Sequence, residues 1–157
     1  ETHVRVVYAR EGRLVGAADP LVGDGGVLLD ETTLSVWDGR LVANCRIQGF
    51  EGRGSGARYL AWGDGRTWEG GRLWQLDDPG CNARMIGSLF VHPGRVDARA
   101  CGEIVRLTPP WEGEVRAEVV ASFGDDVFGY SDATVDGDEA VVVFERDRGL
   151  WEAEARL

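Results

Sequence analysis

The stretch TTLSVWDGRLVANCRI, residues 32–47, places two largely apolar, β-branched runs on either side of an Asp-Gly pair. Asp-Gly favours the tight turn that joins two antiparallel strands, so this stretch predicts a β-hairpin. The same pattern recurs along the chain, with an acidic residue beside glycine or a short charged turn between apolar runs. The other predicted hairpins are residues 4–18, 133–144 and 141–157.

Other segments alternate apolar and polar residues with the period of a β-strand. In residues 95–107, one predicted face carries Val96, Ala98, Ala100, Gly102 and Ile104, and the other carries Arg95, Asp97, Arg99 and Glu103. Segments 114–123 and 151–157 alternate in the same way. This pattern is typical of a sheet with one buried and one solvated face.

The spacing of these signals predicts a single all-β domain over residues 1–157, with about ten strands. We expect one closed antiparallel β-barrel, calycin-like or similar, and keep a two-layer β-sandwich as the alternative. An acidic, lysine-free, tryptophan-rich small barrel resembles the ligand-binding and cofactor-independent cyclase barrels of bacterial metabolism, although a fold does not fix a function.

Composition excludes several classes of function. The 157 residues carry a net charge of −10, so a phosphate backbone would be repelled and no nucleic-acid partner is expected. All 17 basic residues are arginine. Without lysine, the chain forms no lysine Schiff base, holds no pyridoxal phosphate by the usual linkage and completes no Walker A loop.

Cysteine and histidine are too sparse to suggest a metal site. Cys45, Cys81 and Cys101 are far apart, and His3 and His92 are distant from each other, so we expect no metal and no cofactor. Cys81 could pair with Cys101 if the protein were secreted, whereas three reduced thiols fit a cytoplasmic protein, which we expect. No apolar run approaches the ~20 residues that span a membrane, and no signal peptide is visible, so no membrane partner is expected.

The candidate ligand site is the aromatic stretch YLAWGDGRTWEGGRLWQLDDPG, residues 59–80. If residues 66–77 form one bulged strand, Trp68 and Trp74 share a face, whereas a true turn at WEGG places them on neighbouring strands. Either arrangement brings the tryptophans close together. We therefore predict that Tyr59, Trp62, Trp68 and Trp74 line a ligand site, with core packing as the alternative.

Three charged residues complete the candidate site. Arg84, Arg99 and Glu103 alternate out of apolar segments, so they lie either on a solvated face or inside an apolar cavity. The nucleophile pattern GxSxG is absent, and a Ser-His-Asp triad would rest on His92 alone, so no catalytic residue is assigned.

Two functions remain open at this stage. The first is a barrel that binds a small apolar molecule in a tryptophan-lined cavity and, if it is an enzyme, cyclises or isomerises that molecule without a cofactor. The second is a non-catalytic β-sandwich module that presents Trp62, Trp68 and Trp74 to carbohydrate or to a partner protein. The side of the sheet on which the rings lie distinguishes the two.

Overall fold

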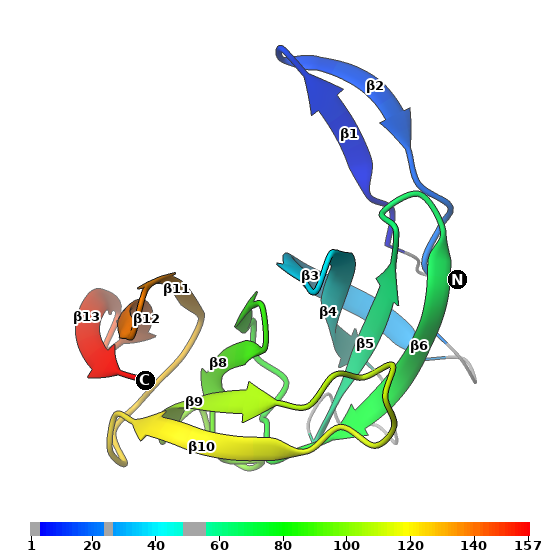
Figure 1. Ribbon diagram of the computed structural model, residues 1–157. Helices are drawn as coiled ribbons and strands as arrows, with labels where there is room; N and C mark the ends of the chain where they lie inside the picture. Colours follow the sequence, from blue (N-terminus) through cyan, green and yellow to red (C-terminus); the bar gives the residue numbers. More distant parts are fainter. Residues whose placement is uncertain (1–3, 24–26, 49–55) are drawn as a thin grey trace.

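The computed structural model describes residues 4–23, 27–48 and 56–157. Within those ranges the chain forms thirteen β-strands and no helix, which confirms the all-β prediction (Figure 1). The strands form four antiparallel sheets, and in each sheet the strands follow one another in chain order.

The first sheet pairs β1 (Val7–Arg10) with β2 (Arg13–Ala17). The second contains β3 (Leu28–Trp37), β4 (Arg40–Gln48), β5 (Ala57–Gly63) and β6 (Trp68–Gln75). The third contains β7 (Arg84–Ile86), β8 (Leu89–Pro93), β9 (Gly102–Leu107) and β10 (Ala117–Ser122). The fourth contains β11 (Ser131–Asp136), β12 (Glu139–Arg146) and β13 (Gly149–Arg156).

All four predicted hairpins are confirmed, as β1–β2, β3–β4, β11–β12 and β12–β13. The turn of β3–β4 is Asp38-Gly39, with φ angles of 47° and 75°. Positive φ at both central residues is the geometry whose twist matches the flanking strands, and Asp-Gly adopts it readily. The turn therefore forms where the local sequence predicts it.

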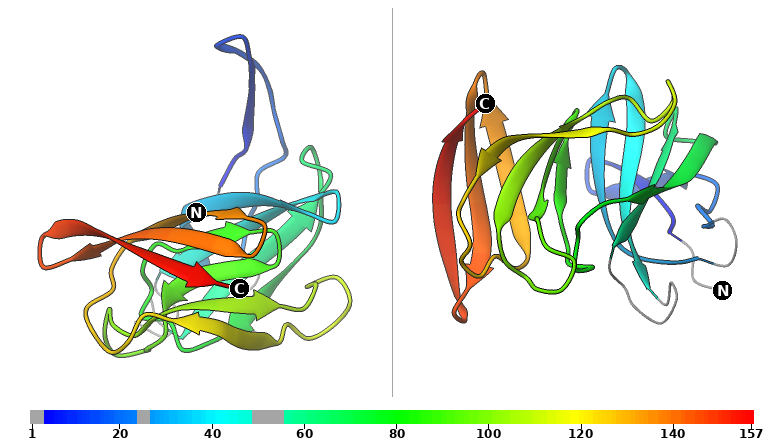
Figure 2. Two further views of the ribbon diagram at one scale, coloured as in Figure 1. Left: turned by 60° about the vertical axis from the view of Figure 1, so that its left-hand side comes forward. Right: turned by 90° about the horizontal axis from the view of Figure 1, so that it is seen from below.

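The three larger sheets lie face to face in chain order, with an apolar core in each interface (Figure 2). The core between β3–β6 and β7–β10 includes Trp37, Val42, Leu60, Trp62, Trp74, Met85, Phe90, Val105 and Leu107. The core between β7–β10 and β11–β13 includes Val91, Ile104, Phe128, Ala140, Val142 and Phe144. The outer face of β3–β6 is covered by a third cluster that includes Leu21 and Leu29.

The first strands of these three sheets, β3, β7 and β11, adjoin one another. The Thr33 hydroxyl donates to the carbonyl of Ala83 at 3.0 Å, and the Gly87 N–H donates to the Ser35 hydroxyl at 2.7 Å. Arg84 Nε lies 3.3 Å from Asp132 Oδ1. The sheets are therefore joined along their first strands.

The prediction of a single closed barrel is wrong, because each described strand pairs only within its own sheet and the layers are sandwich-like. The physical reason is visible in β5, which is buried at every position. A strand that is buried on both faces belongs between two layers, whereas the predicted barrel assumed one solvated face.

The alternation expected over residues 95–107 is also only partly correct. The strand is confined to β9, and Cys101, with a φ of 57°, lies in the left-handed region just before it. Gly102 and Ile104 are buried as expected. Val105 and Leu107 of the opposite face are buried too, against β3–β6, so both faces of this strand carry buried apolar residues.

The hairpin β1–β2 differs from the rest because it projects from the stack (Figures 1 and 2). We call residues 5–17 the arm. It is attached at its base, where the Ala18 N–H donates to the Val6 carbonyl at 2.9 Å and the Asp19 N–H donates to the Arg66 carbonyl at 3.0 Å. In the described part of the chain its strands pair only with each other, and Tyr8 shares a cleft with Asp64, Arg66 and Thr67 of the β5–β6 turn.

Candidate functional site

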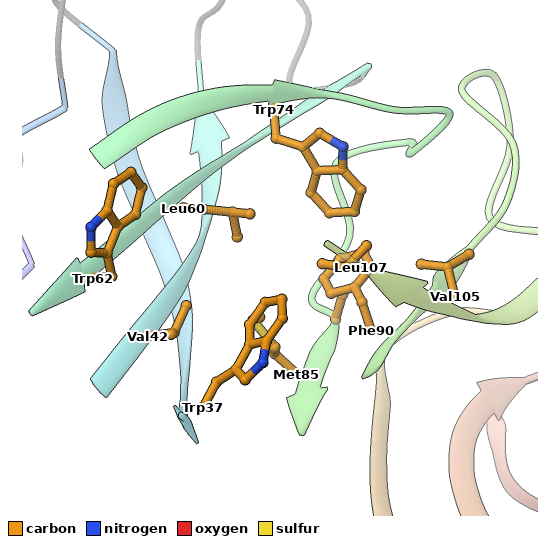
Figure 3. Packing of buried hydrophobic residues seen from close by; sticks show 10 residues of the cluster. Trp37, Val42, Leu60, Trp62, Trp74, Met85, Phe90, Val105 and Leu107 are labelled. Carbon is orange, nitrogen blue, oxygen red and sulfur yellow. The ribbon is translucent and has the colours of Figure 1, made fainter. Parts of the chain in front are cut away.

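Trp62 and Trp74 lie in the core between β3–β6 and β7–β10. Figure 3 shows both indoles in the space between the two sheets, with Leu60 between them in this view. The ring of Trp74 packs edge-on against Phe90, with centroids 5.2 Å apart. Both tryptophans are buried in a filled core.

Tyr59 and Trp68 lie on the opposite face of the same sheet, in the cluster that includes Leu21 and Leu29. The separation of Trp68 from Trp74 results from a bulge in β6. Trp62 pairs with Gly70, but Gly63 pairs with Trp68, which leaves Glu69 as an extra residue. Because each added residue reverses the side-chain face, the bulge places Trp68 and Trp74 on opposite faces.

The predicted segment 66–77 therefore contains one bulged strand, yet Trp68 and Trp74 do not share a face as expected. The four aromatic residues of the candidate site are divided between two clusters. Gly70 and Gly71 are not a turn: a Cβ at Gly70 would collide with the Trp62 ring, and a Cβ at Gly71 would collide with the Tyr59 ring. These glycines let the rings rest on the backbone of β6.

A second aromatic group, missed in the sequence, closes one end of the same interface. Trp111, in the loop between β9 and β10, packs edge-on against Trp37 at 5.1 Å and against Trp62 at 6.5 Å. Arg40 lies over the Trp111 ring at 4.8 Å, and Arg72 lies over the Trp62 ring at 5.7 Å. Trp111 lies in a loop, so no strand pattern in the sequence predicted this contact.

Four ionisable residues form a buried network elsewhere in this interface. Arg58 of β5 donates through Nη2 to both carboxylate oxygens of Asp78, at 3.2 and 3.0 Å, and both side chains are fully buried. His92 Nδ1 lies 3.4 Å from Asp78 Oδ2, and its Nε2 lies 3.5 Å from Glu103 Oε1. The network thus connects β5, the loop after β6 and strands β8 and β9.

Electrostatics favour the ionised form of Asp78. Burial opposes ionisation, but the charge of Arg58 and the contact with His92 outweigh it and hold the pKa of Asp78 below its usual value. The Gly80 N–H also donates to Asp78 at 2.7 Å. In the described ranges Arg58 Nε and Nη1 have no hydrogen-bond partner. A buried ion pair of this kind is costly to break.

The three charged residues of the candidate site have separate surroundings. Glu103 faces His92 in the buried network, and Arg84 pairs with Asp132 across β7 and β11. Arg99 lies over the Tyr130 ring at 5.0 Å. They do not converge with the tryptophans on one cavity.

Arg99 also lines an open cleft of about 470 Å³ beside the turn of β12–β13. Its walls include Val127, Gly129 and residues 145–150. Arg146, in that wall, is held by Asp126 at 3.0 Å. The lining combines Arg99, Arg146 and Arg148 with Glu145 and Asp147, so charges of both signs face this cleft.

The chemistry that these residues could perform is limited. Burial raises the pKa of Cys45 to about 11 and raises the pKa of Cys81, so neither thiol is prepared as a nucleophile. Among the described residues, no group of three His, Cys, Asp or Glu side chains is placed to hold a metal ion. No helix in those ranges is long and apolar enough to cross a membrane.

The arm is a second candidate binding surface, because it carries exposed apolar residues and closely spaced like charges. Val7, Leu14 and Val15 face solvent, whereas Val6 at the base is buried, and Arg10 lies directly opposite Arg13 in the β1–β2 ladder. Like charges in that position repel.

A comparison with known proteins finds no family model that matches the chain and no match among curated proteins.

Proposed function

We propose that this protein is a non-catalytic protein-binding module in which a stack of β-sheets presents the arm to a partner. The observation that carries the proposal is a group of exposed apolar side chains on a hairpin whose strands pair only with each other in the described ranges. Val7, Leu14 and Val15 are 58%, 70% and 63% exposed. A concentration of exposed apolar residues on one element is typical of an interaction surface.

The energetics of a hairpin support the same conclusion. A two-stranded hairpin is marginal in water, because it buries little apolar surface against the entropy of ordering its backbone. The repulsion between Arg10 and Arg13 weakens it further. A partner that covers the apolar residues and supplies negative charge would offset both the entropy cost of ordering the hairpin and the repulsion between the two arginines.

The tryptophans give less support to the small-molecule function, including a cyclase or isomerase. A shared cavity needs Tyr59, Trp62, Trp68 and Trp74 to face one space, and they lie in two clusters on opposite faces of a sheet. Carbohydrate binding needs an exposed row of rings. Among the six tryptophans, all of which lie in described positions, only Trp151 is largely exposed.

Photo-crosslinking from the arm tests the proposal. Leu14 is replaced with photoreactive benzoylphenylalanine, and the folded protein is irradiated both alone and in an extract of its native cells. We expect discrete protein adducts, because the side chain at position 14 would lie in an interface. The matched control is Val36, which is 69% exposed on β3, within the stack.

Position 36 should give no discrete adduct. Adducts at position 14 should also disappear when Arg10→Glu and Arg13→Glu are added. Equal labelling from positions 14 and 36, or none from either, would overturn the proposal. A saturable tryptophan-fluorescence response to an apolar metabolite, with no arm adduct, would favour the small-molecule function instead.

A further inference from the structure

We infer that the partner of the arm is a second copy of this chain, and that the arm docks along strand β13 of that copy. The inference rests on the proposed function, since it names the partner of the same arm. Two independent features of the fourth sheet carry it: an open strand edge and a charge opposite to that of the arm.

The edge of β13 is open to strand addition. The fourth sheet has the order β11-β12-β13, so one side of β13 has no neighbouring strand within the described ranges. An open edge presents unpaired N–H and C=O groups to which an extended segment of another chain can bind.

Apolar side chains accompany that edge. Leu150 is 77% exposed and Trp151 is 48% exposed, both near the start of β13. They offer contacts for Leu14 and Val15 of an incoming arm. Backbone pairing along the edge combined with alternate side-chain contacts is the general mode by which a sheet accepts a strand.

The charge of this surface is opposite to that of the arm. The arm carries three arginines and one glutamate in a chain whose net charge is −10. Residues 131–157 carry eight carboxylates against three arginines, and Glu152 and Glu154 are exposed on β13 itself. Arg10 and Arg13, which repel each other across the free arm, would each gain an acidic neighbour on docking.

Position excludes docking within one chain. The arm and the sheet β11–β13 lie at opposite ends of the stack (Figures 1 and 2). An arm that meets β13 therefore comes from another copy, and the contact is heterologous, with different surfaces on the two sides. Such contacts build open chains or rings rather than two-fold dimers.

Charge reversal with rescue tests this inference. Sedimentation velocity over a concentration series in low salt should show the wild-type mass rising with concentration. R10E/R13E and E152R/E154R should each weaken association about tenfold or more, because like charges then meet in the interface. The four changes in one chain, or an equimolar mixture of the two double variants, should restore association.

The control is E112R/E114R, which reverses two exposed glutamates in the loop after β9 and should leave association unchanged. A wild-type protein that stays monomeric, or a reversal without rescue, overturns the inference. If the purified protein is monomeric while position 14 still crosslinks to another protein, the proposed function stands and only the second copy is wrong. If crosslinking also fails, both are wrong.

Discussion

Hairpins β1–β2 and β3–β4 turn through the same geometry and have opposite surroundings. Glu11-Gly12 has φ angles of 52° and 74°, and Asp38-Gly39 has 47° and 75°. Strands β3 and β4 lie in a four-stranded sheet whose two faces carry apolar cores, while β1 and β2 pair only with each other. Local sequence specifies both hairpins equally, so the difference between them is tertiary.

This difference indicates what stabilises each region. Burial of apolar surface supplies most of the free energy of folding, and β3–β4 buries apolar side chains on both of its faces. The arm buries almost none within one chain. It should therefore tolerate substitution with little effect on global stability, whereas the stack should not.

Truncation of the buried tryptophans should have the largest effect. Trp62→Ala and Trp74→Ala should each lower the free energy of unfolding by about 3–5 kcal/mol, because each leaves a cavity in a filled core. Trp68→Ala should cost less, since Trp68 is only half-buried. Urea denaturation measures all three. A Trp74→Ala protein as stable as the wild type would contradict the packed-core assignment.

Loss of the buried carboxylate should be nearly as severe. Asp78→Ala leaves the Arg58 charge buried without its partner, which should cost about 3–5 kcal/mol. The matched control is Asp97→Ala, which removes an exposed pair with Arg95 and should cost far less, because water screens that pair. Similar losses in the two variants would show that the buried network contributes no more than a surface pair.

The same pair gives the stack a defined response to acid. The pKa of Asp78 is lower in the folded protein than in the unfolded chain, so its stabilising contribution is present above the unfolded carboxyl pKa of about 4. That contribution is lost as the pH falls through the lowered, folded pKa. Asp78→Asn should therefore flatten the loss of stability as the pH falls below about 4, measured by thermal unfolding. An unchanged acid profile would argue against this assignment.

Adding one methyl group should destabilise the stack but not the arm, with an effect of intermediate size. Gly71→Ala places a Cβ against the Tyr59 ring and should cost about 1–3 kcal/mol through overpacking. Gly16→Ala in the arm meets only the Tyr8 ring, at 3.9 Å, and should be close to neutral. Equal melting temperatures for the two variants would contradict the role of Gly71 as a packing surface.

The smallest effect on stability should come from the arm itself. Leu14→Ser and Val15→Ser should change the free energy of unfolding by no more than about 0.5 kcal/mol, because both side chains are already in water. Leu60→Ser, the same change in the core, should cost about 3 kcal/mol or more. If the arm variants destabilise the protein as Leu60→Ser does, the arm is part of the cooperative core.

Strand and hairpin positions could be predicted because turn chemistry is local. The layering could not, since it depends on which sheet each face meets. Every residue of β5 except Arg58 is apolar or aromatic, a pattern that indicates burial on both faces, and a charged residue within that run needs a buried partner. The partner, Asp78, lies in a loop and becomes a neighbour only through the fold.

The candidate site also depends on contacts that the local sequence does not specify. Proximity in sequence suggested that Trp62, Trp68 and Trp74 act together, but one extra residue, Glu69, turns Trp68 to the other face. Gly70 and Gly71 resemble a turn in sequence and serve as a packing surface in the fold. A bulge and a close ring contact depend on the neighbouring strand, so the local pattern did not specify them.

Amide hydrogen exchange tests the contrast between the two hairpins most directly. In dilute monomeric protein, amides of β1–β2 should exchange close to the rate of an unprotected chain, while amides of β3–β4 should be protected by several orders of magnitude. Protection of β1–β2 should rise when a partner or a second copy binds. Amides of β1–β2 as protected as those of β3–β4 in the dilute monomer would contradict the account, because the arm would then be stable without a partner.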